Sequence, residues 1–154
     1  MSTDILKVPK LKQKVTLWVH PEGQVVGSVF VREQSPDHEG AEEPIEVLNS
    51  EAPFIVLQKN SPEEFRFYNR NSIIRVDYST DSQISDNVTV LSCTLNMMDG
   101  SVMEGTIREE LPPEYSRLFD YINQEKARFI RLYFNDNEVS LINKSYIVNV
   151  TTND

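Results

Sequence analysis

The feature that most constrains the fold of this chain is a phrase that occurs twice. Residues 69–76 read Asn-Arg-Asn-Ser-Ile-Ile-Arg-Val, and residues 143–150 read Asn-Lys-Ser-Tyr-Ile-Val-Asn-Val, 74 positions later (143 − 69). Upstream, Phe54-Ile55 matches Phe129-Ile130 at 75 positions (129 − 54). Thr16-Leu17 with Thr94-Leu95, and Gly27 with Gly105, are each 78 positions apart. Because the order is kept while the spacing drifts, we expect an internal duplication with loop insertions.

The length supports two small modules. The chain has 154 residues, which suits one ordinary domain or two small ones. We expect a first β module at 14–77, a linker at 78–87 and a second β module at 88–150, with tails at 1–13 and 151–154. Modules of this size bury only about 60% of their unfolded surface. They should therefore pack on each other, either as separate barrels or as one merged sheet.

Each module is expected to consist mainly of strands. Val15, Leu17 and Val19 alternate with polar or larger neighbours, which is the period of a half-buried strand. Asp99-Gly100 between two β-patterned runs indicates a hairpin. The expected strands are 14–20, 25–31, 54–57, 65–76, 88–97, 101–108, 129–134 and 139–150. Gly27, inside a strand, suggests a bulge or a sharp bend, and Gly105 suggests a bulge or a positive φ.

Two segments are expected to lie outside the strands. Residues 32–46 are acidic and contain many turn-forming residues, which predicts a solvated loop. One short helix should begin at Pro112, since Pro and Glu favour the first helical turn. Its apolar stripe is Tyr115, Leu118, Phe119 and Ile122. The fold class is thus mainly β, with two pseudo-symmetric barrel-like modules and one short helix.

Composition narrows the functional classes. The net charge is −9, so a nucleic-acid backbone would be repelled unless the bases gather on one face. Cys93 is the one cysteine, which excludes an intrachain disulfide and a multi-cysteine metal site. The start of the chain lacks the apolar core of a signal peptide, and no run approaches the ~20 apolar residues of a membrane span. We expect a cytoplasmic protein without membrane contact, of bacterial type.

The second module resembles the Sm-like fold, a small five-stranded barrel of SH3 type. The resemblance is carried by Leu95, Asp99-Gly100, Gly105, Asp120, Asn123 and the strand Phe129-Ile130-Arg131-Leu132, followed by Leu141-Ile142-Asn143-Lys144-Ser145-Tyr146-Ile147-Val148. The first module keeps Gly23, Gly27, Asn49, Asn69 and Arg70. Asn143-Lys144 and Asn69-Arg70 stand where the family has Arg-Gly, so its RNA-reading pair is absent. The chain is also similar to small uncharacterised bacterial domains.

No catalytic, cofactor-binding or metal-binding residues are predicted. His20 abuts a turn and His38 lies in the acidic loop, where no scaffold is evident that would converge three or four metal ligands. Cys93, on a strand, fits a buried small hydrophobe better than a nucleophile. Asp99 is explained by its turn, and Asp120 by capping or by pairing with Arg117 or a nearby Lys. The aromatic residues Phe65, Phe67, Tyr68, Tyr133, Phe134 and Tyr146 are expected in the core.

The repeated Asn-base pairs are the candidate interaction residues. Asn69-Arg70 and Asn143-Lys144 could present two equivalent recognition points. Alternatively, each Asn side chain bonds its own backbone and makes a tight bend between two strands. The predicted role is a non-catalytic protein-interaction or scaffold module that binds a protein partner or itself. The alternatives are an Sm-like RNA binder and a sensor with a small-molecule or ion pocket between the modules.

Overall fold

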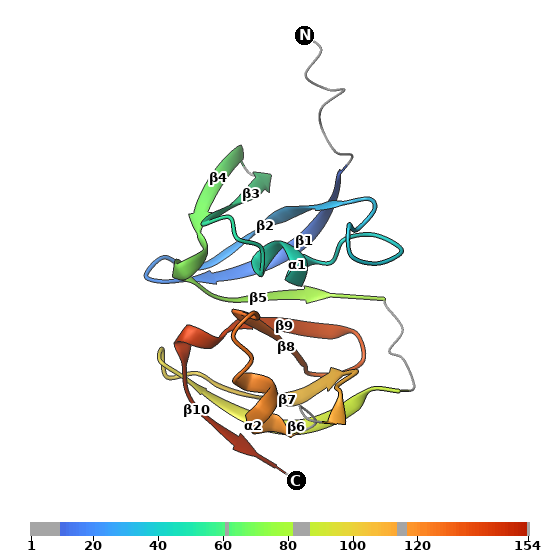
Figure 1. Cartoon of the computed structure of the whole chain (residues 1–154). Coiled ribbons are helices and arrows are strands. Elements are labelled where there is room, and N and C mark those ends of the chain that lie inside the picture. Colours follow the sequence, from blue (N-terminus) through green and yellow to red (C-terminus); the bar gives the residue numbers. More distant parts are fainter. Residues whose placement is uncertain (1–9, 61, 82–86, 114–116, 154) are drawn as a thin grey trace.

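A computed structural model shows a chain built around one open antiparallel sheet of ten strands (Figure 1). It describes residues 10–60, 62–81, 87–113 and 117–153. The strands are β1 (Lys10–Val19), β2 (Gly23–Arg32), β3 (Phe54–Asn60), β4 (Glu63–Asn69), β5 (Ile73–Ser79), β6 (Thr89–Met97), β7 (Val102–Glu109), β8 (Phe129–Tyr133), β9 (Glu138–Asn143) and β10 (Ile147–Thr152). The mainly β prediction is confirmed, but the strands form one continuous sheet that does not close into barrels.

The two halves of the sheet have the same internal strand order. The full order is β10-β6-β7-β8-β9-β5-β1-β2-β3-β4. When the strands are numbered within each half, β1–β5 and β6–β10, both halves have the order fifth, first, second, third, fourth. The registers also coincide: Leu17 lies opposite Val76 in one half, and Leu95 lies opposite Val150 in the other. Both ladders keep this register for one more pair and then shift by one residue, at Ile74 in the first half and at Val148 in the second. The repeated phrases thus occupy equivalent places in the two halves.

Several boundaries differ from those predicted. β1 begins at Lys10 and β10 continues to Thr152, so residues 10–13 and 151–152 are strand rather than tail. A second α-helix, α1 (Pro44–Leu48), lies in the stretch expected to be loop. Pro44 at its first position and a capping box between Glu43 and Glu46 account for it. That start signal was hidden among the acidic residues around it.

The predicted helix is shorter than expected. α2 spans Leu118–Ile122, and residues 114–116 lie outside the described part of the chain, with Tyr115 of the predicted stripe among them. Phe119 of the expected apolar stripe is 71% exposed. The two long strands predicted at 65–76 and 139–150 are each broken by a one-turn 3₁₀ helix, at Arg70–Ser72 and at Lys144–Tyr146.

Gly27 and Gly105 are needed for space rather than for φ. Neither has a positive φ, and the ladders on either side of each show no register shift, so the bulge prediction is wrong. A Cβ on Gly27 would lie 2.6 Å from the carbonyl oxygen of Gln58. On Gly105 it would lie 2.5 Å from that of Tyr133. The third strand of each half crosses the second so closely there that only hydrogen fits.

The two halves share their cores at one junction. β5 of the first half pairs with β9 of the second, with Val76 opposite Leu141. The two strands lie side by side across the middle of the molecule (Figure 1). Four side chains of the second half belong to the hydrophobic core of the first half: Phe129, Tyr133, Val139 and Leu141. In the other direction, Ile74 of β5 belongs to the core of the second half. The merged sheet is therefore also one packing unit.

Candidate interaction surfaces

The predicted asparagines form the two bends. Asn69 Oδ1 accepts a hydrogen bond from the backbone N–H of Asn71 at 2.9 Å, and Asn143 Oδ1 accepts one from Ser145 at 3.0 Å. Each closes a turn over its own backbone two residues ahead. Asn143 is fully buried, and its amide also donates to the carbonyl of Ile73 at 2.9 Å. Both asparagines therefore have the geometry of the second interpretation, in which the side chain makes a tight bend between two strands.

The basic residue of each pair binds the C-terminal end of a helix. Arg70 Nη1 donates to the carbonyl of Leu48 at 3.5 Å, and Lys144 Nζ donates to Ile122 at 3.0 Å and to Gln124 at 2.6 Å. Leu48 and Ile122 end α1 and α2, whose terminal carbonyls carry partial negative charge. Burial lowers the pKa of Lys144. These two cations help to fix the helices on the sheet.

The structure brings the two bends into contact. The Tyr146 hydroxyl donates to the carbonyl of Asn71 at 3.1 Å, and the guanidinium of Arg128 donates to the Asn71 side chain. Arg70 is 9% exposed, and none of the described carboxylates lies within ion-pair distance of it. Its pKa is lowered by burial and then by the charge of Arg128. The predicted residues therefore converge on one side of the junction.

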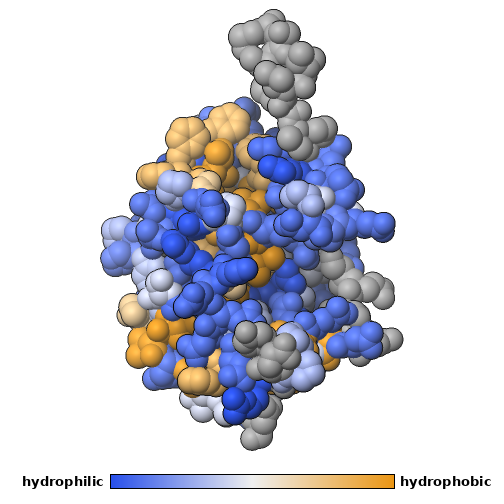
Figure 2. Space-filling model, viewed as in Figure 1, coloured by the Kyte–Doolittle hydropathy of each residue, from blue (hydrophilic) through white to orange (hydrophobic). Residues whose placement is uncertain are grey.

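A surface that the sequence did not reveal lies on β3 and β4. Figure 2 shows hydrophobic side chains gathered over these strands, at the top of the molecule. We call it the phenylalanine face; it consists of Phe54 (55% exposed), Val56 (38%), Phe65 (57%) and Phe67 (70%). Phe65 stacks on Phe30 of β2 with ring centroids 6.3 Å apart. The prediction that Phe65 and Phe67 belong to the core is wrong, as it is for Phe134, which is 42% exposed; Tyr68 and Tyr133 are buried.

The same positions in the second half are buried. Phe129, Val139 and Leu141 are equivalent to Phe54, Phe65 and Phe67 by the spacings of 75 and 74 positions, and they are 0%, 1% and 0% exposed. They are covered because β5 and the core of the first half pack over them. β4, the equivalent of β9, is the last strand of the sheet, and β10, the equivalent of β5, is the first. Sequence patterning cannot distinguish the covered face from the open one, because both alternate in the same way.

His38 belongs to a hydrogen-bonded cluster at the start of α1. Its Nδ1 lies 2.8 Å from the carbonyl of Glu39, and its Nε2 lies 2.9 Å from a carboxylate oxygen of Glu46. Because both partners only accept, both ring nitrogens must donate and the imidazole is protonated in this geometry. The Glu39 carbonyl and then Glu46 raise the pKa of His38. Partial burial opposes ionisation of Glu46, but hydrogen bonds from Glu43 N–H, Ser35 and His38 lower its pKa overall.

Ligand atoms of His38, Glu43 and Glu46 lie within 4.8 Å of one another, so geometry alone would allow one cation to reach all three. Glu46 is already occupied, because it accepts from the Ser35 hydroxyl at 2.7 Å and from Glu43 N–H at 2.5 Å. The cluster is explained by the way it ties the acidic loop to α1. It shows no separate feature that calls for a metal ion.

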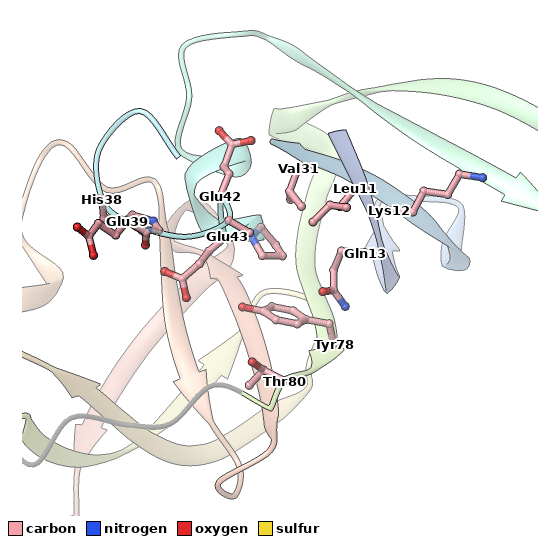
Figure 3. Close-up of a pocket in the computed structure, with 12 residues that line it drawn as sticks. Leu11, Lys12, Gln13, Val31, His38, Glu39, Glu42, Glu43, Tyr78 and Thr80 are labelled. Carbon is pink, nitrogen blue, oxygen red and sulfur yellow. The ribbon is translucent and has the colours of Figure 1, made fainter. Parts of the chain in front are cut away.

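Two hollows flank this loop. One of about 520 Å³ lies between β1 and the loop, where Tyr78 points toward Glu43 (Figure 3). Burial raises the pKa of Tyr78 to about 12. A larger cleft of about 730 Å³ lies between the halves, lined by Arg131, Glu109 and Glu46 among others. This is where a small-molecule or ion sensor would bind its ligand.

Arg131, a charged group of the larger cleft, is paired with two carboxylates. Arg131 lies 3.3 Å from Glu43 and 3.7 Å from Glu109. Burial raises the pKa of Glu109, against the opposing attraction of Arg131. The Glu43 contact joins the start of α1 in the first half to β8 in the second, whereas Glu109 ends β7 in the same half as Arg131. The position of Arg131 in the cleft is thus fixed by these two carboxylates, although its buried Nε has no hydrogen-bond partner among the described residues.

Comparison with known proteins adds no relative. No protein-family model, curated protein or solved structure matches the chain. Among the described residues, no helix has the length and apolar content to cross a membrane. The open edges of the sheet and the phenylalanine face are the features of the molecule that bear on function.

Proposed function

We propose that this chain is a non-catalytic scaffold that assembles head to tail with copies of itself. The observation that carries the proposal is the β5–β9 junction, which already joins two halves with the same strand order and register. β4 and β10 are the equivalents of β9 and β5, and both lie at the open edges of the sheet. Open edges carry unpaired backbone donors and acceptors that can accept another strand. We expect β10 of one copy to pair with β4 of the next in the same way that β5 pairs with β9 inside the chain.

The internal junction also specifies the register. In the internal junction Val76 lies opposite Leu141. The equivalent of Val76 in the second half is Val150, 74 positions later, and the equivalent of Leu141 in the first half is Phe67, 74 positions earlier. Val150 of one copy should therefore lie opposite Phe67 of the next. Tyr78 opposite Val139 becomes Thr152 opposite Phe65 in the same way. The two edges lie at opposite ends of the molecule (Figure 1). One chain therefore cannot satisfy its own edges, and the contact is between copies.

The phenylalanine face supplies the driving force. Burial of a Phe side chain contributes roughly 1.5–3 kcal/mol. The equivalent face of β8 and β9 shows where these side chains go, because it is packed into the core of the preceding half. Arg66 on β4 pairs with Glu22 at 2.8 Å and with Glu64 at 2.6 Å. These charges are of the kind that limits unspecific edge pairing, so the partner edge has to match.

The contact is heterologous, since one copy offers β4 and the next offers β10. Repeated contacts of this kind give a ring when the rotation closes and a filament when it does not. As part of the same proposal, the halves arose by duplication of one Sm-like module, and the assembled protein works in the cytoplasm. The two equivalent halves support the duplication.

Sedimentation of the purified chain tests the proposal. We expect weight-average mass to rise with concentration from the micromolar range to about 1 mM, the span that covers weak contacts. Phe67→Glu should abolish the rise, because it places a charge in the centre of the contact. Phe134→Glu is the matched control at an exposed phenylalanine away from both edges, and it should change nothing. A wild-type chain that stays monomeric throughout would reject the scaffold.

RNA binding is the second candidate, and one observation favours it. Arg70 and Arg128 lie close enough at the bends for the charge of one to lower the pKa of the other, and Arg70 is not ion-paired with any described carboxylate. Salt separates the two functions. Added salt weakens RNA binding through counterion release, whereas it screens the −9 charge of each copy and strengthens self-association. Binding to an RNA pool that survives Arg70→Gln would remove this candidate site.

A further inference from the structure

We infer that the exposed end of α2 is a docking site for the first residue of β3 from a second copy, with Asn123 binding the backbone of that residue, Phe54. The inference rests on the proposed self-assembly and identifies the residue that positions it. Asn123 ends α2, at the opposite end of the molecule from β3 and β4 (Figure 1). It carries an amide, which can accept from an N–H and donate to a carbonyl of the same residue.

The model for this site is Asn49, which ends α1 at the internal junction. Its Oδ1 accepts from the backbone N–H of Phe129 at 2.8 Å, and its Nδ2 donates to the carbonyl of Phe129 at 3.2 Å. Both backbone groups of the first residue of β8 are thus taken by one side chain from the other half. This pair of hydrogen bonds fixes the position of β8 along the junction.

Asn123 is the equivalent of Asn49 in position and backbone shape. The two are 74 positions apart, the spacing that also relates the bends. Asn49 caps its helix at φ −90° and ψ 2°, and Asn123 caps its helix at φ −90° and ψ 5°. Arg70 and Lys144 bind the equivalent helix ends at Leu48 and Ile122. The backbone that presents the amide is therefore the same at both sites.

Phe54 is the equivalent of Phe129 and is open to solvent. The residue before each of them accepts an equivalent hydrogen bond. Arg70 N–H donates to the carbonyl of Pro53 at 2.8 Å, and Lys144 N–H donates to the carbonyl of Arg128 at 2.9 Å. Phe129 is fully buried, whereas Phe54 is 55% exposed. Within the described residues, no side chain hydrogen-bonds to the backbone of Phe54. Phe54 therefore presents the groups that Asn49 binds in Phe129.

An exposed apolar side chain stands beside Asn123. Phe119 on α2 is equivalent to Ile45 on α1 by the same spacing of 74 positions. Ile45 packs against the first core, which includes Phe129 and Leu141 of the second half. Phe119 is 71% exposed and has no such cover. It would contact Phe54 and Phe67 of the arriving copy, the counterparts of the side chains near Ile45.

The amide of Asn123 must turn when the second copy arrives. Its Nδ2 donates to the Phe119 carbonyl of its own helix at 2.8 Å. Rotation exchanges this bond for one to Phe54 and adds the bond that Oδ1 accepts. The surrounding helix need not move, because α1 holds Asn49 with the same cap geometry.

Sedimentation equilibrium of Asn123→Ala tests the site. We expect association about 10-fold weaker than that of the wild type, which corresponds to loss of one to two net hydrogen bonds. Asn137→Ala, in the turn between β8 and β9, is the control and should leave the association unchanged. Thermal unfolding of both variants should match that of the wild type, since Asn123 and Asn137 are both exposed.

A substitution on the other side isolates the backbone contact. Phe54→Pro removes the N–H that Asn123 would accept from, while Phe54→Ala keeps it, and Pro is tolerated at the first residue of a strand. We expect Phe54→Pro to weaken association beyond Phe54→Ala in the wild-type background, and the two to be equal in the Asn123→Ala background. If the wild type and the Asn123→Ala variant associate equally well, this inference is overturned while the scaffold stands. A wild type that never associates would overturn the scaffold itself.

Discussion

Val76 of β5 lies opposite Leu141 of β9, and this pair joins the two halves of the chain into one sheet. Val76 is 1% exposed and Leu141 is fully buried. Their equivalents, Val150 and Phe67, are at the two open edges, where Phe67 is 70% exposed. One sequence pattern thus produces a completed junction in the middle of the molecule and an uncompleted half of it at each end.

Equivalent substitutions should change the free energy of unfolding by different amounts at these two places. Leu141→Ala should lower the free energy of unfolding by about 2–5 kcal/mol, because it leaves a cavity in a shared core. Phe67→Ala should change it by less than about 0.5 kcal/mol, since the side chain is exposed in one copy. Urea unfolding at low concentration measures both. Equal losses would mean that Phe67 is already covered within one chain.

Gly105 should not tolerate even a methyl group. Its Cβ would lie 2.5 Å from the Tyr133 carbonyl, so Gly105→Ala should cost at least about 1–3 kcal/mol through overpacking. Gly23 has φ +93° with nothing within 4 Å of a Cβ, so Gly23→Ala should cost only backbone strain of about 1 kcal/mol. Melting temperatures of the two variants rank them. The reverse order would refute the close crossing of β7 and β8.

Alanine substitutions of Asn143 and Asn69 should lower stability by different amounts, although the two bends are alike. Asn143→Ala leaves the buried carbonyl of Ile73 without its donor and should cost about 1–3 kcal/mol. Asn69 is exposed and its side chain serves only the bend, so Asn69→Ala should cost less, about 0.5–1.5 kcal/mol. Chemical denaturation compares them. If both variants unfold like the wild type and lose a binding partner, the residues act in recognition rather than in the bends.

His38 should titrate above its ordinary pKa of 6.5, because the Glu39 carbonyl and Glu46 favour its protonated form. Because the folded-state pKa is the higher one, the contact stabilises the loop fully below pH 6.5 and is lost as the pH rises through the raised pKa. The imidazole ¹H shift against pH gives the midpoint. Glu46→Gln should lower that midpoint, and a midpoint unmoved by the substitution would show that Glu46 does not hold the ring.

The sequence predicts the strands and the relation between halves better than it predicts the connections. The alternation in Val15, Leu17 and Val19 and the Asp99-Gly100 turn lead to strands that the structure contains. The start of α1 was missed because a five-residue helix is too short to show a period. The sequence marks Gly105 as a special position but not the reason for it, because the close approach of β8 is a tertiary contact that local patterns do not contain.

The candidate surface could not be found from the sequence in the same way. Phe65 and Val139 alternate identically with their neighbours, yet one is 57% exposed and the other 1%. What separates them is which strand happens to be covered by the other half. Arg70 and Lys144 were identified as possible recognition residues, and the structure places them on helix ends that form only when α1 and α2 fold.

The most direct test of the account is a disulfide between β10 of one copy and β4 of the next. Residues directly opposite in an antiparallel pair have Cα atoms about 4.5–5.5 Å apart, within disulfide range, whereas a two-residue offset exceeds it. Chains carrying Phe67→Cys and chains carrying Val150→Cys would be mixed and oxidised, with Phe67→Cys and Thr152→Cys as the off-register control. Native Cys93 lies opposite Thr152 in the β6–β10 pair, so every chain also carries Cys93→Ser to prevent an intrachain disulfide.

The account predicts mixed dimers that accumulate faster for the Phe67–Val150 mixture than for the Phe67–Thr152 mixture, and faster than either chain links to itself. Equal rates in the two mixtures, or a predominance of Phe67–Phe67 links, would contradict the claim that copies repeat the β5–β9 junction.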